Sequence, residues 1–150
     1  MSRKQWATLA LMVVVYLYQG NSMAAPPKKL DVRTMQDWSI VVAGAAIESE
    51  KYAAEEFGDF FAQATGHRLP IRSDSASETK NVFIGASDAL TNSNLAHALE
   101  REYAEEELRI IIEQDNIAIV GGRPRGVLYG VYQFLEQCVG LRFLAPDYTY

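Results

Sequence analysis

The chain has 150 residues, of which 49% are hydrophobic, and its 14 basic and 19 acidic side chains give a net charge of −5. An acidic chain without clustered lysine and arginine has no electrostatic basis for binding nucleic acid, and the hydrophobic content excludes a disordered chain. The single cysteine, Cys138, excludes an intrachain disulfide.

The first 24 residues have the order of features found in a secretory signal peptide. Arg3 and Lys4 form a positive start, residues 7–18 are almost wholly apolar, and Ser22 and Ala24 are the small residues of a cleavage site after Ala24. The apolar run of about 12 residues is shorter than the roughly 20 needed to span a bilayer. We therefore expect this segment to be removed and the protein to be exported, to the periplasm or outside the cell, with no membrane attachment left.

Residues 25–37 are predicted to be a linker, and residues 38–147 a single domain. The first half of this domain has the pattern strand, helix, strand, strand. These elements are a strand at 38–42, a helix from the N-cap Ser49 to Gly66, a short extended piece at 69–71 and a buried strand at 82–84. Apolar residues at helical spacing predict the buried face of the helix: Ala53, Phe57, Phe60, Phe61 and Ala64.

The second half predicts a helix, a hairpin, a second helix and a last strand. The helix is at 94–103, the hairpin pairs 108–112 with 117–120, a loop follows at 121–126, and an amphipathic helix at 127–139 leads to a strand at 141–144, stopped by Pro146. We expect the second helix to bury Val127, Val131, Phe134, Leu135 and Cys138. The order β-α-β-β-α-ββ-α-β predicts an α/β (α+β) fold, a mixed sheet of about five or six strands with helices packed on it.

Side chains with catalytic chemistry are present but show no spacing that would bring them together. The histidines, His67 and His97, have no partner at metal-ligand spacing, and Cys138 is interpreted as a small buried side chain. The carboxylates fall into helix faces and a charge run at 100–107, so no converging pair for glycoside hydrolysis is indicated. We therefore predict no catalytic residue, no metal and no cofactor for these 150 residues.

The loop at 121–126 lies between a predicted strand and helix and contains Gly121, Gly122 and Gly126. Its glycine spacing differs from the dinucleotide fingerprint, and Pro124 removes an amide donor, so the glycines are interpreted as permitting a tight turn. Three nearby side chains are candidates for binding a substrate or a partner domain: Arg123, Arg125 and Tyr129.

Two sequence stretches carry a resemblance to a known family. They are Arg125-Gly126-Val127-Leu128-Tyr129-Gly130-Val131-Tyr132-Gln133-Phe134-Leu135-Glu136 and Val139-Gly140-Leu141-Arg142-Phe143-Leu144-Ala145-Pro146-Asp147. They resemble the end of the N-terminal domain that precedes the barrel in α-glucuronidases. A related domain occurs in β-N-acetylhexosaminidases and in uncharacterised bacterial glycosidase-like proteins, and the resemblance extends over residues 38–147.

The resemblance implies a sheet with helices on one side, carried as a non-catalytic accessory domain of an exported glycoside hydrolase that degrades polysaccharide. In such families the catalytic carboxylates come from a following (β/α)8 barrel, which would be the domain's partner, with a polysaccharide as a second candidate partner. We expect the chain to be a fragment or truncated product of such an enzyme, which would be a glycoside hydrolase if the barrel follows. The alternatives are a stand-alone module that binds a polysaccharide or a protein and, least favoured, a small independent hydrolase.

Overall fold

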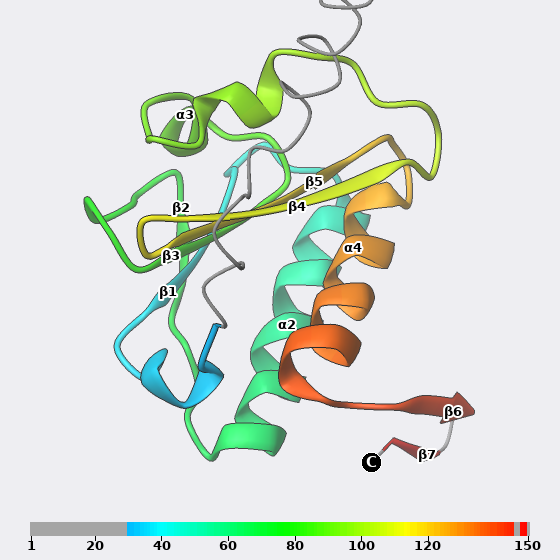
Figure 1. The fold of residues 1–150 in the computed structure, drawn as a ribbon. Helices are drawn as coiled ribbons and strands as arrows, with labels where there is room; N and C mark the ends of the chain where they lie inside the picture. The colour runs from blue at the N-terminus through cyan, green and yellow to red at the C-terminus, as the bar shows by residue number, and fades with distance from the viewer. Residues whose placement is uncertain (1–29, 146–147, 150) are drawn as a thin grey trace, which may run out of the picture. The chain divides into compact units, whose positions relative to one another are not determined.

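The computed structural model describes residues 30–145, 148 and 149, with side chains as far as Arg142. The predicted signal peptide, residues 25–29 of the predicted linker and Pro146 lie outside the described residues. Residues Asp31–Tyr150 form one compact unit. Within this unit, five strands form a mixed sheet in the order β2-β1-β3-β5-β4 (Figure 1). The predicted fold class is confirmed.

The central strands are short apolar runs that are buried on both faces of the sheet. Strands β1 (Ser39–Val42), β3 (Asn81–Ile84) and β5 (Asn116–Gly121) are parallel to one another. The edge strand β2 (Ile71–Ser73) is parallel to β1, and the opposite edge strand β4 (Leu108–Glu113) is antiparallel to β5. Nearly continuous apolar sequence is typical of strands covered from both sides.

The two long helices pack side by side on one face of the sheet (Figure 1). These are α2 (Glu48–Thr65) and α4 (Gly126–Phe134), the latter continued by one π-helical turn, η3 (Leu135–Val139). The rings of Phe57 and Phe134 join them, with centroids 5.4 Å apart. Glycines in the left-handed conformation follow both helical segments, Gly66 at φ 78° and Gly140 at φ 85°, as predicted.

The buried face of α2 is rotated relative to the prediction. Ala53, Phe57 and Phe61 are buried as expected, but Ala54 and Gly58 complete the face. Phe60 is only half-buried and Ala64 is exposed. Phe60 and Ala64 are therefore not part of the buried face.

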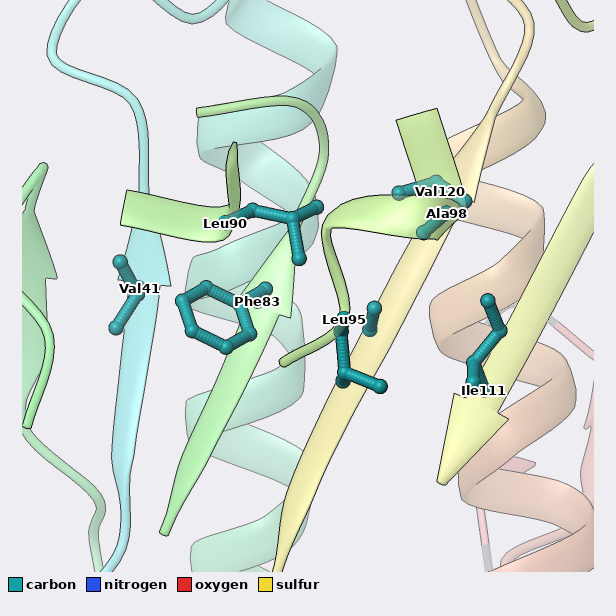
Figure 2. Close-up of a cluster of buried hydrophobic side chains, with 8 residues drawn as sticks. Val41, Phe83, Leu90, Leu95, Ala98, Ile111 and Val120 are labelled. Atoms are coloured by element: carbon teal, nitrogen blue, oxygen red, sulfur yellow. The ribbon is translucent and has the colours of Figure 1, made fainter. Parts of the chain in front are cut away.

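The opposite face of the sheet is covered by two short helices, α3 (Asp88–Thr91) and the 3-10 helix η2 (Ala96–Leu99). Figure 2 shows Leu90, Leu95 and Ala98 from this segment in one buried cluster with sheet residues Val41, Phe83, Ile111 and Val120. The resemblance implied helices on one side, and this second layer was not predicted.

The predicted helix at 94–103 is wrong in its boundaries. Helical structure begins earlier, because the Ser87 hydroxyl caps α3 by accepting the amide of Leu90 at 3.1 Å. It is interrupted because Asn92 and Ser93 donate side-chain hydrogen bonds to the carbonyls of Asp88 and Leu90, competing with the helical pattern. Leu99 ends η2, and residues 100–107 continue without a helix.

The predicted hairpin is confirmed. Glu113 pairs with Asn116, and the two turn residues, Gln114 and Asp115, have φ of 47° and 61°, the sign that a two-residue type I′ turn requires. After η3, β6 (Phe143–Ala145) pairs only with β7 (Tyr148–Thr149), in a separate two-stranded sheet. The predicted last strand therefore exists but does not join the main sheet.

Two smaller features complete the unit. A 3-10 helix, η1 (Val32–Thr34), lies in the segment predicted as a linker, and Met35 beside it is fully buried. Over the ranges that the structure describes, no helix is long and apolar enough to cross a membrane.

Candidate functional site

The best candidate site is the edge of the sheet where the parallel strands β1, β3 and β5 end. The chain leaves β1 through α2 to reach β2 on one side, whereas β3 and β5 lie on the other side. In open α/β sheets, such a divergence of connections creates a crevice at the carboxyl ends of the strands. The N-terminal ends of α2 and α4 lie at this edge, which also carries the loop at 121–125 (Figure 1).

Glu50 is the one buried charged side chain among the described residues, with 3% of its surface exposed. The guanidinium of Arg123 binds it with two hydrogen bonds, from Nε to Oε1 at 3.2 Å and from Nη2 to Oε2 at 3.3 Å. The same carboxylate accepts the backbone amide of Ile47 at 3.3 Å, which caps α2 from within. Glu50 therefore joins the first turn of α2 to the loop after β5.

The helix starts one residue before the predicted cap. Ile47 precedes α2, and Ser49 lies in its first turn. The Ser49 hydroxyl donates instead to the carbonyl oxygen of Pro124 at 2.6 Å. Ser49 therefore makes a second link between α2 and the loop, and the prediction of Ser49 as the N-cap is wrong.

The loop requires glycines because neighbouring backbone atoms leave no room for side chains. None of Gly121, Gly122 and Gly126 has a positive φ. A Cβ on Gly122 would overlap the carbonyl oxygen of Ala104, and one on Gly126 would overlap that of Glu107. The amide of Gly122 donates to Glu107 at 2.8 Å and that of Gly126 to Gly122 at 2.8 Å, so these two donors are already used within the fold.

The three predicted binding residues all lie at this edge. Arg123 is paired with Glu50 and keeps 58% of its side chain exposed. A hydrogen bond with Tyr129 is the largest cause of a raised pKa for Arg125, and the carboxylates of Glu105 and Glu106 add to it. Tyr129 is itself 37% exposed. Arg125 and Tyr129 thus form one exposed pair, separate from the Arg123–Glu50 pair, and binding by these residues stays a prediction.

A hollow of about 660 Å³ lies beside the buried ion pair. Arg101 stacks on the ring of Tyr103, with 4.7 Å between the guanidinium carbon and the ring centroid, and forms an ion pair with Glu107. Three charged groups around the hollow, Glu50, Arg101 and Arg123, therefore have partners within the protein. Its lining is Glu50, Ala86, Leu99, Arg101, Glu102, Tyr103, Val120, Gly121, Gly122 and Arg123.

Glu50 was not among the residues predicted to form a site. The available signal was its place three residues after Ile47, because an acid at this position of a helix commonly accepts the amide of the cap. Its pairing with Arg123 had no local signal, since the two residues are 73 positions apart.

The remaining candidates for chemistry do not converge. His97 lies 3.5 Å from Glu113, and His67 is exposed at the end of α2. Burial raises the pKa of the half-buried Cys138, which disfavours the reactive thiolate. In the part of the chain that the structure describes, no three His, Cys, Asp or Glu side chains are placed to hold a metal ion.

The fold and this edge define a small α/β domain with an open, mostly parallel sheet. A family model described as the glycosyl hydrolase family 67 N-terminus matches residues 28–134, more than two thirds of the chain. The chain belongs to this family, and the predicted resemblance is confirmed. The match covers the first part of the recognised motif, which forms α4, and includes Arg123, Arg125 and Tyr129. No curated protein shows a significant match to the chain.

Proposed function

We propose that the chain provides the non-catalytic N-terminal domain of an exported, α-glucuronidase-like glycoside hydrolase that acts on polysaccharide. The family match over residues 28–134 carries this proposal. In the full protein the domain packs on the catalytic (β/α)8 barrel, which holds the acid and base of the reaction.

The state of Glu50 supports the non-catalytic role. A glycosidase acid or base needs a carboxyl group that faces its substrate and can exchange a proton with it. Glu50 instead binds Arg123 and the amide of Ile47, and it connects two parts of the fold. Its contacts are those of a structural ion pair.

We infer that the barrel contacts the exposed side of α2 and α4 at the carboxyl edge of the sheet. Tyr52 on α2 and Tyr129 on α4 are 49% and 37% exposed. Arg125 adds a planar cation next to Tyr129. Tyrosine and arginine are enriched in the centres of protein interfaces, which favours this surface as the contact.

The test has two parts, activity and assembly. The purified chain should release no product from chromogenic glycosides or from glucuronate-bearing oligosaccharides. A separately expressed family 67 catalytic barrel should bind it, and Arg125→Glu should weaken that binding while Arg72→Glu, on the far edge strand β2, should not. If the chain alone hydrolyses one of these substrates and Glu50→Gln abolishes that activity, the proposal is wrong.

Export is the second part of the proposal and rests on the N-terminal sequence. Arg3, Lys4, the apolar residues 7–18 and the small residues before Ala25 support a cleaved signal peptide. After expression of the whole gene in a bacterial host, mass spectrometry of the secreted and periplasmic fractions should find a chain that begins at Ala25. Recovery of the intact N-terminus in the cytoplasm alone would contradict export.

A stand-alone binding module is the alternative, and the exposed rings of Tyr52 and Tyr129 are the observation that favours it. Titration with xylan, chitin and glucuronate-bearing oligosaccharides separates the two functions. Saturable binding that Tyr129→Ala removes would favour the module, and a flat titration together with binding of the barrel would favour the accessory domain.

A further inference from the structure

The outer edge of β4 has no strand paired with it among the described residues. Its six residues, Leu108–Glu113, contain no proline, glycine or lysine, which are common means of blocking an edge strand. Ile112 at this edge is 42% exposed. The strand therefore presents free backbone groups and an apolar side chain together.

The hydrogen-bonding pattern shows which backbone groups face outward. The amide of Gly122 donates to the carbonyl of Glu107 at 2.8 Å, at the end of the β4–β5 ladder. In an antiparallel pair, residues alternate between bonding to the partner strand and pointing away from it. The outward-facing groups are therefore those of Leu108, Ile110 and Ile112.

The side chains of β4 alternate between the two faces of the sheet. Leu108 lies close to Gly130 of α4, so Leu108, Ile110 and Ile112 are on the helical face of the sheet. Arg109 and Glu113 are exposed on the other face, on either side of Ile111, which is 8% exposed. Arginine and glutamate thus stand at equal distances from Ile111 along the strand.

We propose that two copies of this chain associate through β4, as antiparallel strands centred on Ile111. This register places Arg109 opposite Glu113 of the partner subunit, and Glu113 opposite the partner's Arg109. On the other face, Ile110 lies opposite the partner's Ile112. The result is a continuous sheet through both subunits, with two opposite-charge pairs on one face and two apolar pairs on the other.

The backbone agrees with this register. Ile110 and the partner's Ile112 both have outward-facing groups, so they can form a hydrogen-bonded pair. Arg109 and the partner's Glu113 then form the closer, non-hydrogen-bonded kind of pair, in which side chains interact most strongly. Moving the centre to Ile110 or to Ile112 would set Arg109 or Glu113, respectively, opposite the partner's Ile111. Only the centre at Ile111 matches both charge and backbone pattern.

The test is sedimentation velocity of the purified protein over a wide concentration series. A contact of this small size predicts a concentration-dependent dimer with a dissociation constant in roughly the micromolar range. Arg109→Glu and Glu113→Arg each place like charges opposite one another and should each raise this constant by about tenfold or more. Arg72→Glu on β2 and Glu55→Arg on α2 are controls with the same charge changes away from β4, and both should dimerise like the wild type.

Mixing the two edge variants provides the decisive comparison. In the Arg109→Glu variant both paired positions are acidic, and in the Glu113→Arg variant both are basic. Both cross-strand pairs between these two chains are therefore opposite in charge, and a heterodimer should form. The double variant R109E/E113R should likewise regain its own dimer, which also shows that the substitutions do not prevent folding.

Three results would overturn the proposal. The first is a wild type that stays monomeric throughout the concentration series, and the second is a pair of mixed variants that do not associate. The third is a monomer whose β4 amides become protected from exchange only when the catalytic barrel is added, because that result makes the barrel the occupant of this edge.

Discussion

At the scale of single residues, Glu50 shows how a buried charge is held in this fold. Its carboxylate has 3% of its surface exposed and is bound by a guanidinium and a backbone amide. Gly85, at φ 76°, lies against it, and a Cβ there would come within 3.2 Å of the Glu50 carboxyl carbon. The glycine therefore meets both a conformational and a spatial requirement.

Removing the guanidinium should cost more stability than removing the whole pair. Arg123→Ala leaves Glu50 buried without its cation, and we expect a loss of about 1–3 kcal/mol in unfolding free energy, moderated by the exposure of Arg123. In Glu50→Gln/Arg123→Ala the buried charge is gone, and the amide oxygen can still accept from Ile47. Chemical denaturation of both variants checks this, and a double variant less stable than Arg123→Ala would contradict it.

Replacing glycine by alanine should lower the unfolding free energy at one position and raise it at another. Gly122→Ala forces a Cβ into the backbone of Ala104, and we expect a loss of about 2–4 kcal/mol. In Gly58→Ala the Cβ meets Ile40 Cδ1 at an ordinary 3.5 Å, and the better helix former should add up to about 1 kcal/mol. Thermal unfolding measures both. A tolerated Gly122→Ala would show that the loop does not need this close approach.

At the scale of elements, α2 and α4 are joined by the contact between the rings of Phe57 and Phe134 and by a hydrogen bond. The Tyr132 hydroxyl of α4 donates to Glu56 Oε2 of α2 at 2.8 Å. Burial, and then this hydrogen bond, raise the pKa of Tyr132 above its usual range. A hydrogen bond with the same carboxylate raises the pKa of Tyr52. The neutral phenols therefore hold a carboxylate between the two helices.

The raised pKa of Tyr132 predicts a loss of stability in alkali. The unfolded phenol loses its proton near pH 10, whereas the folded one retains it. The contribution of Tyr132 to the unfolding free energy is therefore complete below about pH 10 and declines above it. Tyr132→Phe should cost about 0.5–1.5 kcal/mol at neutral pH and should reduce the decline at high pH. Denaturation curves measured across this pH range test both effects. An equally steep decline in the variant would assign the loss to other groups.

At the scale of the whole molecule, the same sheet is packed against helices on both of its faces. Phe83 faces α3 and η2, whereas its neighbours Val82 and Ile84 face the layer of α2 and α4. Because the same strands are buried from both sides, loss of either layer exposes strands that the other layer needs. We therefore expect the described unit to unfold cooperatively.

Large-to-small substitutions on the two faces test this expectation. Phe83→Ala on one face and Phe57→Ala on the other should each lower the unfolding free energy by about 3–5 kcal/mol. Circular dichroism and amide hydrogen exchange should report the same single transition in both variants. A separate early transition for α3 and η2 in Phe83→Ala would show that the second layer is an independent unit.

The sequence by itself determined the elements and the family, because both are encoded in neighbouring residues. Apolar runs predicted β1, β3 and β5, and helical spacing with the closing Gly66 predicted α2. The motif that begins at Arg125 predicted the family over a region that forms α4. Where polar side chains compete for local backbone groups, as between Ser87 and Asn94, pattern alone placed the helix wrongly.

Only the tertiary structure decided which distant groups meet. The strand order, the short helices on the second face, the pairing of Glu50 with Arg123 and the free edge at β4 all depend on contacts between segments far apart in the chain. Periodicity within one segment reports which side of it is apolar and carries no information about what covers that side. The glycines at 121–126 illustrate the difference: the sequence predicted that they permit a tight turn, whereas the structure shows that none has a positive φ and that the backbone of residues 104–107 leaves no room for a Cβ at Gly122 and Gly126.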